Sequence, residues 1–231
     1  MTKSIENLFI IMSAGSDLLI ILIFLFKYKK VKAEQGLWAI FVYCASSLIT
    51  NYIGDHVLPA NYKYIFYTFF TLLEYSIFSF FLFLSIINKR FRQVIFTLSI
   101  AFIIFILTYL SFAKHPKIDS LCIGIETILI ILYSFWYLYE QMKNTNNLFI
   151  YSKYEFWVIA GLLIYLAGSF FIYIFANQVD EKLIINYWFL TNVFYIIKNF
   201  FFAIAIYNYV KKVSQGQKSI YSSKNLHPFY H

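Results

Sequence analysis

Residues 183–210 read LIINYWFLTNVFYIIKNFFFAIAIYNYV, and this stretch decides the fold. It is long enough to cross a bilayer, because about 20 consecutive apolar residues suffice for a membrane-spanning helix. One cation, Lys198, lies near its middle. A lysine at the centre of a membrane helix is unfavourable by about 2.5–3.5 kcal/mol on insertion scales. The stretch therefore predicts a transmembrane helix that carries a buried positive charge, which must be stabilised by other groups.

Lys198 is too deep to reach water along its own helix. The nearest basic boundary begins around Lys211, which at about 1.5 Å per residue lies roughly 20 Å away. A lysine side chain extends only about 6 Å, so its ammonium group does not reach the membrane surface. We therefore expect an internal partner, a cavity or a covalent adduct at Lys198.

Similar apolar stretches recur along the whole chain, which is 61% hydrophobic and only 13% charged. They predict an all-α bundle of seven transmembrane helices that forms one membrane domain over residues 1–212, with no separate soluble domain. A flexible cytoplasmic tail is predicted over residues 213–231. The predicted spans are Ile5–Phe26, Leu37–Ile53, Tyr64–Ile87, Val94–Phe112, Leu121–Tyr139, Phe156–Ala176 and Leu183–Val210.

The basic residues predict the orientation of the bundle. Thirteen lysines and arginines follow the odd-numbered spans, whereas five lie at the opposite ends. By the positive-inside rule the N-terminus is outside and the C-terminus is cytoplasmic. We expect a multi-pass protein of the cytoplasmic (inner) membrane. Because the net charge of +8 follows the membrane boundaries, it does not indicate nucleic-acid binding.

The chain also repeats itself. A shift of 120 residues aligns the third span with the seventh and gives ten identities in 24 positions, among them Tyr75/Tyr195 and Phe81/Phe201. The first and second spans align with the fifth and sixth. This pattern predicts a parallel 3+1+3 repeat with halves at about 5–90 and 120–210, joined by a linker helix at about 94–112. The alternative is that helices of similar composition align by chance.

Glu74 is the expected partner of Lys198. In the repeat alignment Glu74 matches Phe194, which places the carboxylate about one turn, roughly 6 Å, nearer the outside than the lysine Cα. Side chains of a helix lean toward its N-terminus, so Lys198 points toward that level. If the two helices face each other, the ammonium and carboxylate groups can meet. Such a pair either serves a function or only fixes the helix register.

Asp17 and Glu126 occupy matching positions in the two halves, each just after a glycine. They could line a wet outer vestibule or relay protons to Glu74. Alternatively, each bonds a hydroxyl or amide group on a neighbouring helix. The candidate partners are Ser47, Thr50, Asn51, Ser169, Asn192 and Asn199.

Other residues narrow the function classes. Tyr43 and Tyr165, followed by small residues at matched positions, are candidates for an internal face. The four histidines have no metal-ligand spacing, so we expect no metal site. No nucleophile–base pair or glycine-rich phosphate loop is present, so we expect no enzyme. Cys44 and Cys122 fit small packing residues rather than a disulfide framework.

Helices six and seven carry a resemblance to the microbial rhodopsins. The pattern Gly161-x-x-Ile-Tyr165-x-x-Gly168-x-Phe-x-x-Tyr173 resembles the sixth helix of the proteorhodopsin branch, and Lys198-Asn-Phe-Phe201 is similar to its retinal-linking segment. The resemblance implies retinal as a cofactor, bound as a Schiff base on Lys198 beside Tyr165. It implies Glu74, followed by Tyr75, as the counter-ion.

Several residues of that family are missing. Thr71 stands in place of its arginine, Phe194 in place of its second aspartate and Leu162 in place of the tryptophan that packs on retinal. These departures favour a sensor over an outward proton pump. The 3+1+3 order also resembles small sugar and vitamin transporters in topology alone, and the absence of proline from every span counts against transport.

The favoured hypothesis is a membrane receptor or sensor built around Glu74 and Lys198, which signals through its inner loops or a partner membrane protein. One alternative is a small-solute or proton-coupled transporter that uses the same pair with Asp17 and Glu126. Another is a membrane protein whose buried pair is only structural. Beyond the lipid bilayer and that signalling partner, the protein could also form a homo-oligomer.

Overall fold

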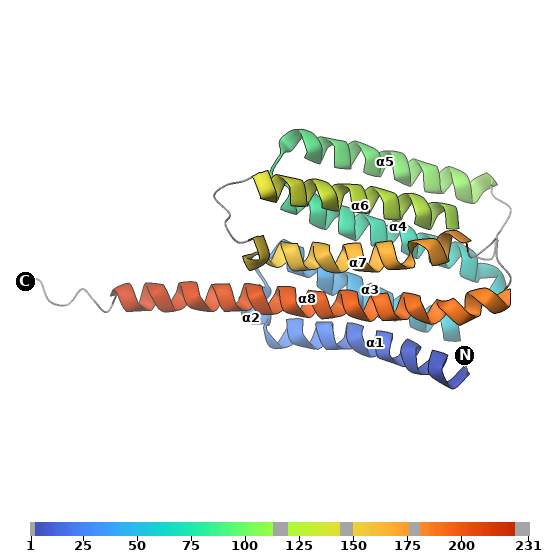
Figure 1. Ribbon diagram of the computed structural model, residues 1–231, viewed down its shortest axis with the longest axis horizontal. Helices are drawn as coiled ribbons and strands as arrows, with labels where there is room; N and C mark the ends of the chain where they lie inside the picture. The colour runs from blue at the N-terminus through green and yellow to red at the C-terminus, as the bar shows by residue number, and fades with distance from the viewer. Residues whose placement is uncertain (1–2, 113–119, 144–149, 176–180, 225–231) are drawn as a thin grey trace, which may run out of the picture.

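Long apolar segments without proline allow each predicted span to form one uninterrupted helix. The computed structural model describes residues 3–112, 120–143, 150–175 and 181–224, and every regular element found there is helical (Figure 1). The α-helices are α1 (Lys3–Phe26), α2 (Tyr28–Val31), α3 (Gln35–His56), α4 (Ala60–Ser85), α5 (Lys89–Phe112), α6 (Ser120–Lys143), α7 (Tyr154–Phe175) and α8 (Glu181–Lys224). A 3-10 turn, η1 (Ile150–Ser152), precedes α7.

Seven of these helices are long and apolar enough to cross a membrane, all within the described ranges. They coincide with the seven predicted spans, so the all-α class and the number of membrane-capable helices are confirmed. The short α2 turn lies between α1 and α3. This is the arrangement of a multi-pass membrane protein.

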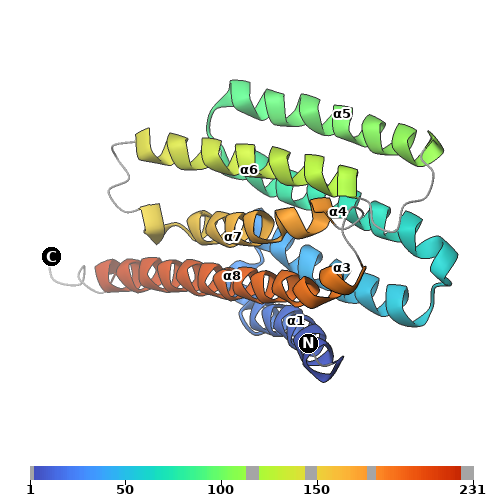
Figure 2. The same cartoon turned by 45° about the vertical axis from the view of Figure 1, so that its right-hand side comes forward.

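Six of the seven long helices pack in a continuous ring. Helix α1 packs on α3, α3 on α4, α4 on α6, α6 on α7, α7 on α8 and α8 on α1. Helix α5 packs on α4 and lies at the edge of the bundle, away from α1 and α8 (Figures 1 and 2). The ring brings the helix of Lys198 between the first and sixth predicted spans.

Two glycines let α7 approach α8 closely. A Cβ atom at Gly161 would lie 2.8 Å from the Phe201 Cβ and 3.1 Å from the Lys198 backbone oxygen. A Cβ at Gly168 would lie 2.6 Å from the Phe194 ring. Small residues at a membrane helix interface permit such backbone approach. The glycine spacing on which the resemblance was based thus has a packing role at the level of Lys198.

The far end of α8 differs from expectation. The predicted flexible tail begins at residue 213, but α8 continues as a helix to Lys224, and the rest of that tail, residues 225–231, lies outside the described residues. No proline interrupts residues 213–224, so the helical hydrogen bonds can continue. Figure 1 shows this part of α8 projecting beyond the other helices. The Lys30 ammonium donates a hydrogen bond to Ser214 Oγ over 2.7 Å near the base of the projection.

A carboxylate ties α6 to the connection between α4 and α5. The two oxygens of Glu140 accept hydrogen bonds from the backbone N–H groups of Ile87 at 2.8 Å and Asn88 at 2.7 Å. The Asn88 side chain in turn accepts from Arg90 N at 2.9 Å. Backbone N–H groups at the start of α5 have no partners within the helix, and these side chains supply the missing hydrogen-bond acceptors.

Candidate functional site: a lysine enclosed by tyrosines

Lys198 is completely buried in the interior of the bundle, with a solvent exposure of 0%. It lies on α8, inside the membrane-capable segment Tyr187–Gln215. Its ammonium group points into the protein and has an internal hydrogen-bond partner, the Tyr43 hydroxyl. The candidate site consists of Lys198, this partner and the side chains around the ammonium group.

Four aromatic rings surround the ammonium nitrogen. The ring centres lie at 3.5 Å for Tyr195, 4.1 Å for Tyr43, 4.6 Å for Tyr165 and 5.6 Å for Phe202. The negative face of an aromatic ring attracts a cation within about 6 Å, most strongly where water is excluded. These residues, here called the aromatic cage, come from α3, α7 and α8. The cage replaces part of the hydration that Lys198 loses.

A tyrosine hydroxyl joins Lys198 to Glu74. The ammonium donates a hydrogen bond to the Tyr43 oxygen over 2.6 Å, and the Tyr43 hydroxyl donates to Glu74 Oε1 over 3.0 Å. Glu74 is buried on α4. The structure therefore links Lys198 and Glu74 through Tyr43, whereas the sequence left open whether the two groups meet directly. The register explains this, because Tyr43 on α3 packs between α4 and α8.

Asp17 lies on the other side of the cage and is fully buried. The Tyr195 hydroxyl lies 2.9 and 2.8 Å from its two carboxylate oxygens, and the Asn199 amide donates to Oδ1 over 2.8 Å. Ser47 shares a 2.7 Å hydrogen bond with the same Tyr195 hydroxyl. The sequence allowed Asp17 to line a wet vestibule or to bond a hydroxyl or amide group on a neighbouring helix. Its bonds to Tyr195 and Asn199 of α8 match the second possibility. Asn199 is a direct partner, and Ser47 acts on Asp17 both directly and through Tyr195.

Glu126 is also buried, on α6. Tyr173 of α7 lies within electrostatic range of Glu126, Glu74 and Tyr165. The structure thus groups Lys198, Glu74, Tyr165 and Asp17 around one centre. Glu126 approaches that centre from the α6 side.

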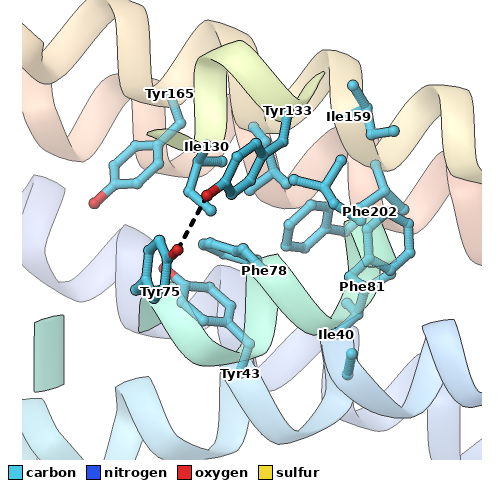
Figure 3. Close-up of a cluster of buried hydrophobic side chains, with 14 of the residues drawn as sticks. Ile40, Tyr43, Tyr75, Phe78, Phe81, Ile130, Tyr133, Ile159, Tyr165 and Phe202 are labelled. Carbon is cyan, nitrogen blue, oxygen red and sulfur yellow. Dashed lines mark hydrogen bonds between the residues drawn. The ribbon is translucent and has the colours of Figure 1, made fainter. Parts of the chain in front are cut away.

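A second hydrogen-bonded cluster lies on the side of α4 that faces α5 and α6. The Tyr75 hydroxyl is 3.3 Å from the Tyr133 hydroxyl of α6 and 3.1 Å from Ser99 Oγ of α5. Figure 3 shows Tyr75 and Tyr133 meeting beside Phe78, with Tyr43 and Tyr165 nearby. The Phe78 ring centre is 4.6 Å from that of Tyr43. This packing fixes α4, and hence Glu74, relative to the cage.

Sequence reasoning missed three features of the site: Tyr195, Phe202 and the bridging role of Tyr43. A signal existed for two of them, because Tyr195 and Phe202 lie three residues before and four residues after Lys198, on its own helix face. With 21 tyrosines and 28 phenylalanines in the chain, that spacing alone did not distinguish them. The role of Tyr43 depends on how α3 packs, which no local pattern contains.

Chemically, the site combines one amine, two carboxylates and a set of hydroxyl groups away from water. It can hold charge within the bilayer, and its hydroxyl groups can pass protons between neighbours. Comparison with protein-family models, curated proteins and solved structures found no significant match to this chain. The class that fold and site define is therefore a multi-pass helical membrane protein with a caged lysine.

Proposed function

We propose that the chain is an integral membrane receptor or sensor, and not an enzyme, whose detecting site is the caged Lys198. The observation that carries this proposal is that side chains from several helices contact, directly or through one hydroxyl, the same ammonium group. Tyr43 of α3, Glu74 of α4 and Tyr165 of α7 all hold Lys198 of α8, and Asp17 of α1 lies behind Tyr195. A change of charge at this centre alters contacts of five helices at once.

The helix that carries the lysine also supplies a route for the signal. Helix α8 continues beyond the bundle, and its base contacts α2 through the Lys30–Ser214 hydrogen bond. A shift of α8 at Lys198 would move the projecting part as a lever. A partner membrane protein that contacts this part, or the inner loops, would receive the signal.

The test measures whether the charge at the site reaches the projection. Spin labels at Tyr28→Cys and Gln215→Cys, in a background with Cys44 and Cys122 replaced by alanine, report the α2–α8 distance by electron spin resonance. Lys198→Met and Glu74→Gln should change the distance distribution, whereas the exposed control Tyr207→Phe should leave it unchanged. Identical distributions in all folded variants would refute the proposal.

Retinal is the ligand that the rhodopsin resemblance suggests. Lys198 would hold it as a Schiff base, Glu74 would act as counter-ion, and the rings of Tyr165 and Phe202 would flank it. Bound retinal would supply light absorption. The buried amine with a carboxylate one hydroxyl away fits this chemistry. Leu162, buried where the family has a ring, and the close α7–α8 contact at Gly161 reduce the room beside the lysine.

A visible spectrum tests this branch. Full-length protein is incubated with all-trans retinal, alongside Lys198→Ala and a control, Lys211→Ala, which removes an exposed lysine from the same helix. A red-shifted band in wild type and Lys211→Ala but not in Lys198→Ala supports retinal. A folded wild-type protein without such a band excludes retinal and leaves the receptor proposal to the spin-label test.

The topology is part of the same proposal: N-terminus outside, C-terminus cytoplasmic, and a 3+1+3 repeat in the inner membrane. The packing order supports the repeat. Helices α1, α3 and α4 contact one another in the same sequence as α6, α7 and α8, and α5, the proposed linker, lies outside the ring. In this arrangement the caged lysine lies where the two proposed halves meet.

A proton-coupled or small-solute transporter is the second candidate, favoured by the hydroxyl contacts. Tyr195 contacts Asp17, and Tyr43 links Lys198 to Glu74, so exchangeable protons lie close together in the membrane interior. Proteoliposomes with an internal pH dye separate the two functions. A transporter should acidify the lumen under a pH gradient, and the movement should stop in Glu74→Gln. A receptor should give neither effect, and nor should a protein whose buried pair is only structural.

A further inference from the structure

The buried carboxylate of Asp17 lies in a shell of oxygen atoms that the receptor proposal does not use. The Tyr195 hydroxyl contacts both carboxylate oxygens, and Ser47 Oγ lies 2.7 Å from that hydroxyl. The Asn199 amide nitrogen bridges Asp17 Oδ1 at 2.8 Å and Ser16 Oγ at 2.7 Å. Hydroxyl, amide and carboxylate oxygens are the ligands that hard cations prefer.

The charges around this shell do not balance. Asp17 and Glu74 are two buried acids, and Lys198 is the buried base that interacts with both. With all three ionised, the site has one excess negative charge. An uncompensated charge away from water is strongly unfavourable, so the site must take up either a proton or one additional monovalent cation.

One polar atom beside the shell lacks a partner. Asn199 is 1% exposed, and its Oδ1 is a buried acceptor without a hydrogen bond, whereas its Nδ2 faces Asp17 and Ser16. Buried polar atoms in proteins are nearly always paired with protein, water or an ion. With a cation between these groups, rotation of the amide about its Cβ–Cγ bond would exchange the two atoms and present Oδ1 to Asp17 and Ser16 in place of the two Nδ2 hydrogen bonds. The amide would then add an oxygen atom to those of Asp17, Ser16 and Tyr195, with the Cys44 thiol beside Asp17.

We propose that Asp17, Ser16, Asn199 and the Tyr195 hydroxyl form a binding site for one sodium ion. The carboxylate supplies the charge, and the neutral oxygens complete the coordination. The bound ion supplies the positive charge that the three buried ionisable groups lack. The inference does not depend on the proposed function, because a receptor and a transporter would both need the charge.

Polar side chains lie on the way from the bundle end where α1 begins. About one turn nearer that end than Asp17, Ser47 and Tyr195 are Ser13 of α1, Thr50 of α3 and Asn192 of α8. Ser13 and Thr50 are buried, and Asn192 is half-buried with a buried amide nitrogen that lacks a hydrogen bond. In Figure 1 the beginning of α1, the end of α3 and the beginning of α8 lie at the same end of the bundle. These groups could replace part of the ion's hydration during access.

Protons compete with sodium at such a site, because either supplies one positive charge. The ionisable groups that act on Asp17 come from three helices. They are Tyr43 and Cys44 of α3, Glu74 of α4, and Tyr195 and Lys198 of α8. A proton on Asp17 is therefore the alternative occupant that the binding experiment must distinguish from sodium.

Radioactive ²²Na⁺ binding to the purified full-length chain, in choline chloride of constant ionic strength, tests the proposal. We expect saturable binding that unlabelled Na⁺ displaces at least about tenfold more effectively than K⁺. Asp17→Asn should lower the affinity by at least about tenfold. Tyr207→Phe, at an exposed position of α8, should bind as the wild type does.

A milder substitution keeps the test valid if Asp17→Asn does not fold. Ser16 is half-buried, so Ser16→Ala should fold and should bind sodium several-fold more weakly. Sodium should also raise the melting temperature of the wild type but not that of Asp17→Asn. The proposal is overturned if the folded wild type shows no saturable ²²Na⁺ binding, which would mean that a proton or water fills the site. It is equally overturned if Na⁺ and K⁺ bind alike or if Ser16→Ala leaves the affinity unchanged.

Discussion

A single side chain, Lys198, presents the main physical problem of this molecule. Its ammonium group loses all contact with bulk water and gains one hydrogen bond, four aromatic rings and two nearby carboxylates in exchange. Each of these contributions is modest alone, and a buried charged group is stable only when all of its partners are present. Substitutions at this site should therefore interact strongly with one another.

The first prediction concerns Lys198 and Glu74. Lys198→Met alone leaves two buried carboxylates without their cation, so it should lower the free energy of unfolding by about 3–5 kcal/mol. Adding Glu74→Gln removes one of those charges and should restore part of the stability. Unfolding in mixed micelles measures both values. Strictly additive losses would mean that the two groups are not coupled.

The second prediction isolates the bridging hydroxyl. Tyr43→Phe keeps the ring that faces the ammonium but removes the oxygen between Lys198 and Glu74. The buried donor and acceptor are then left unsatisfied, so we expect a loss of about 1–3 kcal/mol in the free energy of unfolding. Tyr207→Phe, at a position that is 65% exposed, is the matched control and should change little. Equal effects of the two substitutions would exclude the bridge.

At the scale of the element, the contact between α7 and α8 positions the lysine. Gly161 and Gly168 are two helical turns apart, and both lie against α8. The approach is close enough for the Gly161 Cα to face the backbone of Lys198 itself. Without it, Tyr165, which lies between the two glycines on α7, would not reach the ammonium nitrogen.

The third prediction follows from that contact. Gly161→Ala places a methyl group 2.8 Å from the Phe201 Cβ and 3.1 Å from the Lys198 oxygen, so one helix must move. We expect a loss of about 1–3 kcal/mol in the free energy of unfolding, the usual range for overpacking a tight interface.

Gly15→Ala is the control for this substitution, because no atom lies within 4 Å of the position that its new methyl group would take. It should be neutral or slightly stabilising, since alanine favours the helix by up to about 1 kcal/mol. Thermal unfolding of both variants in the same detergent compares them, and similar stabilities would contradict the close-contact account.

At the scale of the whole molecule, the ring of six helices is closed by α8 against α1 and by α4 against α6. Five of these six helices contribute to the lysine site. The site therefore forms only when the first and last spans have met, and its contacts stabilise the closed ring.

The fourth prediction tests the orientation of the bundle. Val57, at the end of α3, is 63% exposed, and Met142, at the opposite end of α6, is 76% exposed. With the N-terminus outside, a membrane-impermeant maleimide should label Val57→Cys in intact cells and Met142→Cys only after permeabilisation. Cys44 and Cys122 are buried and should give little background. The reverse labelling pattern would mean that the bundle is inverted.

The sequence by itself determined the helical class, the seven membrane-capable segments and the burial of Lys198. These properties follow from local composition, because an apolar run of sufficient length has few ways to satisfy its backbone in lipid. The main feature that local composition did not predict is the part of α8 beyond residue 212. Its polar sequence favoured a flexible tail, whereas the helix continues to Lys224.

Only the tertiary structure decided which groups surround the lysine. Glu74 and Asp17 could be singled out because a buried acid is rare in an apolar segment. Tyr43, Tyr195 and Phe202 could not, because aromatic residues are common everywhere in this chain and most of them serve packing. Their roles depend on the angle and register with which α3, α7 and α8 meet. Those quantities arise from contacts between residues up to about 180 positions apart, such as Asn199 and Ser16, and no local pattern encodes them.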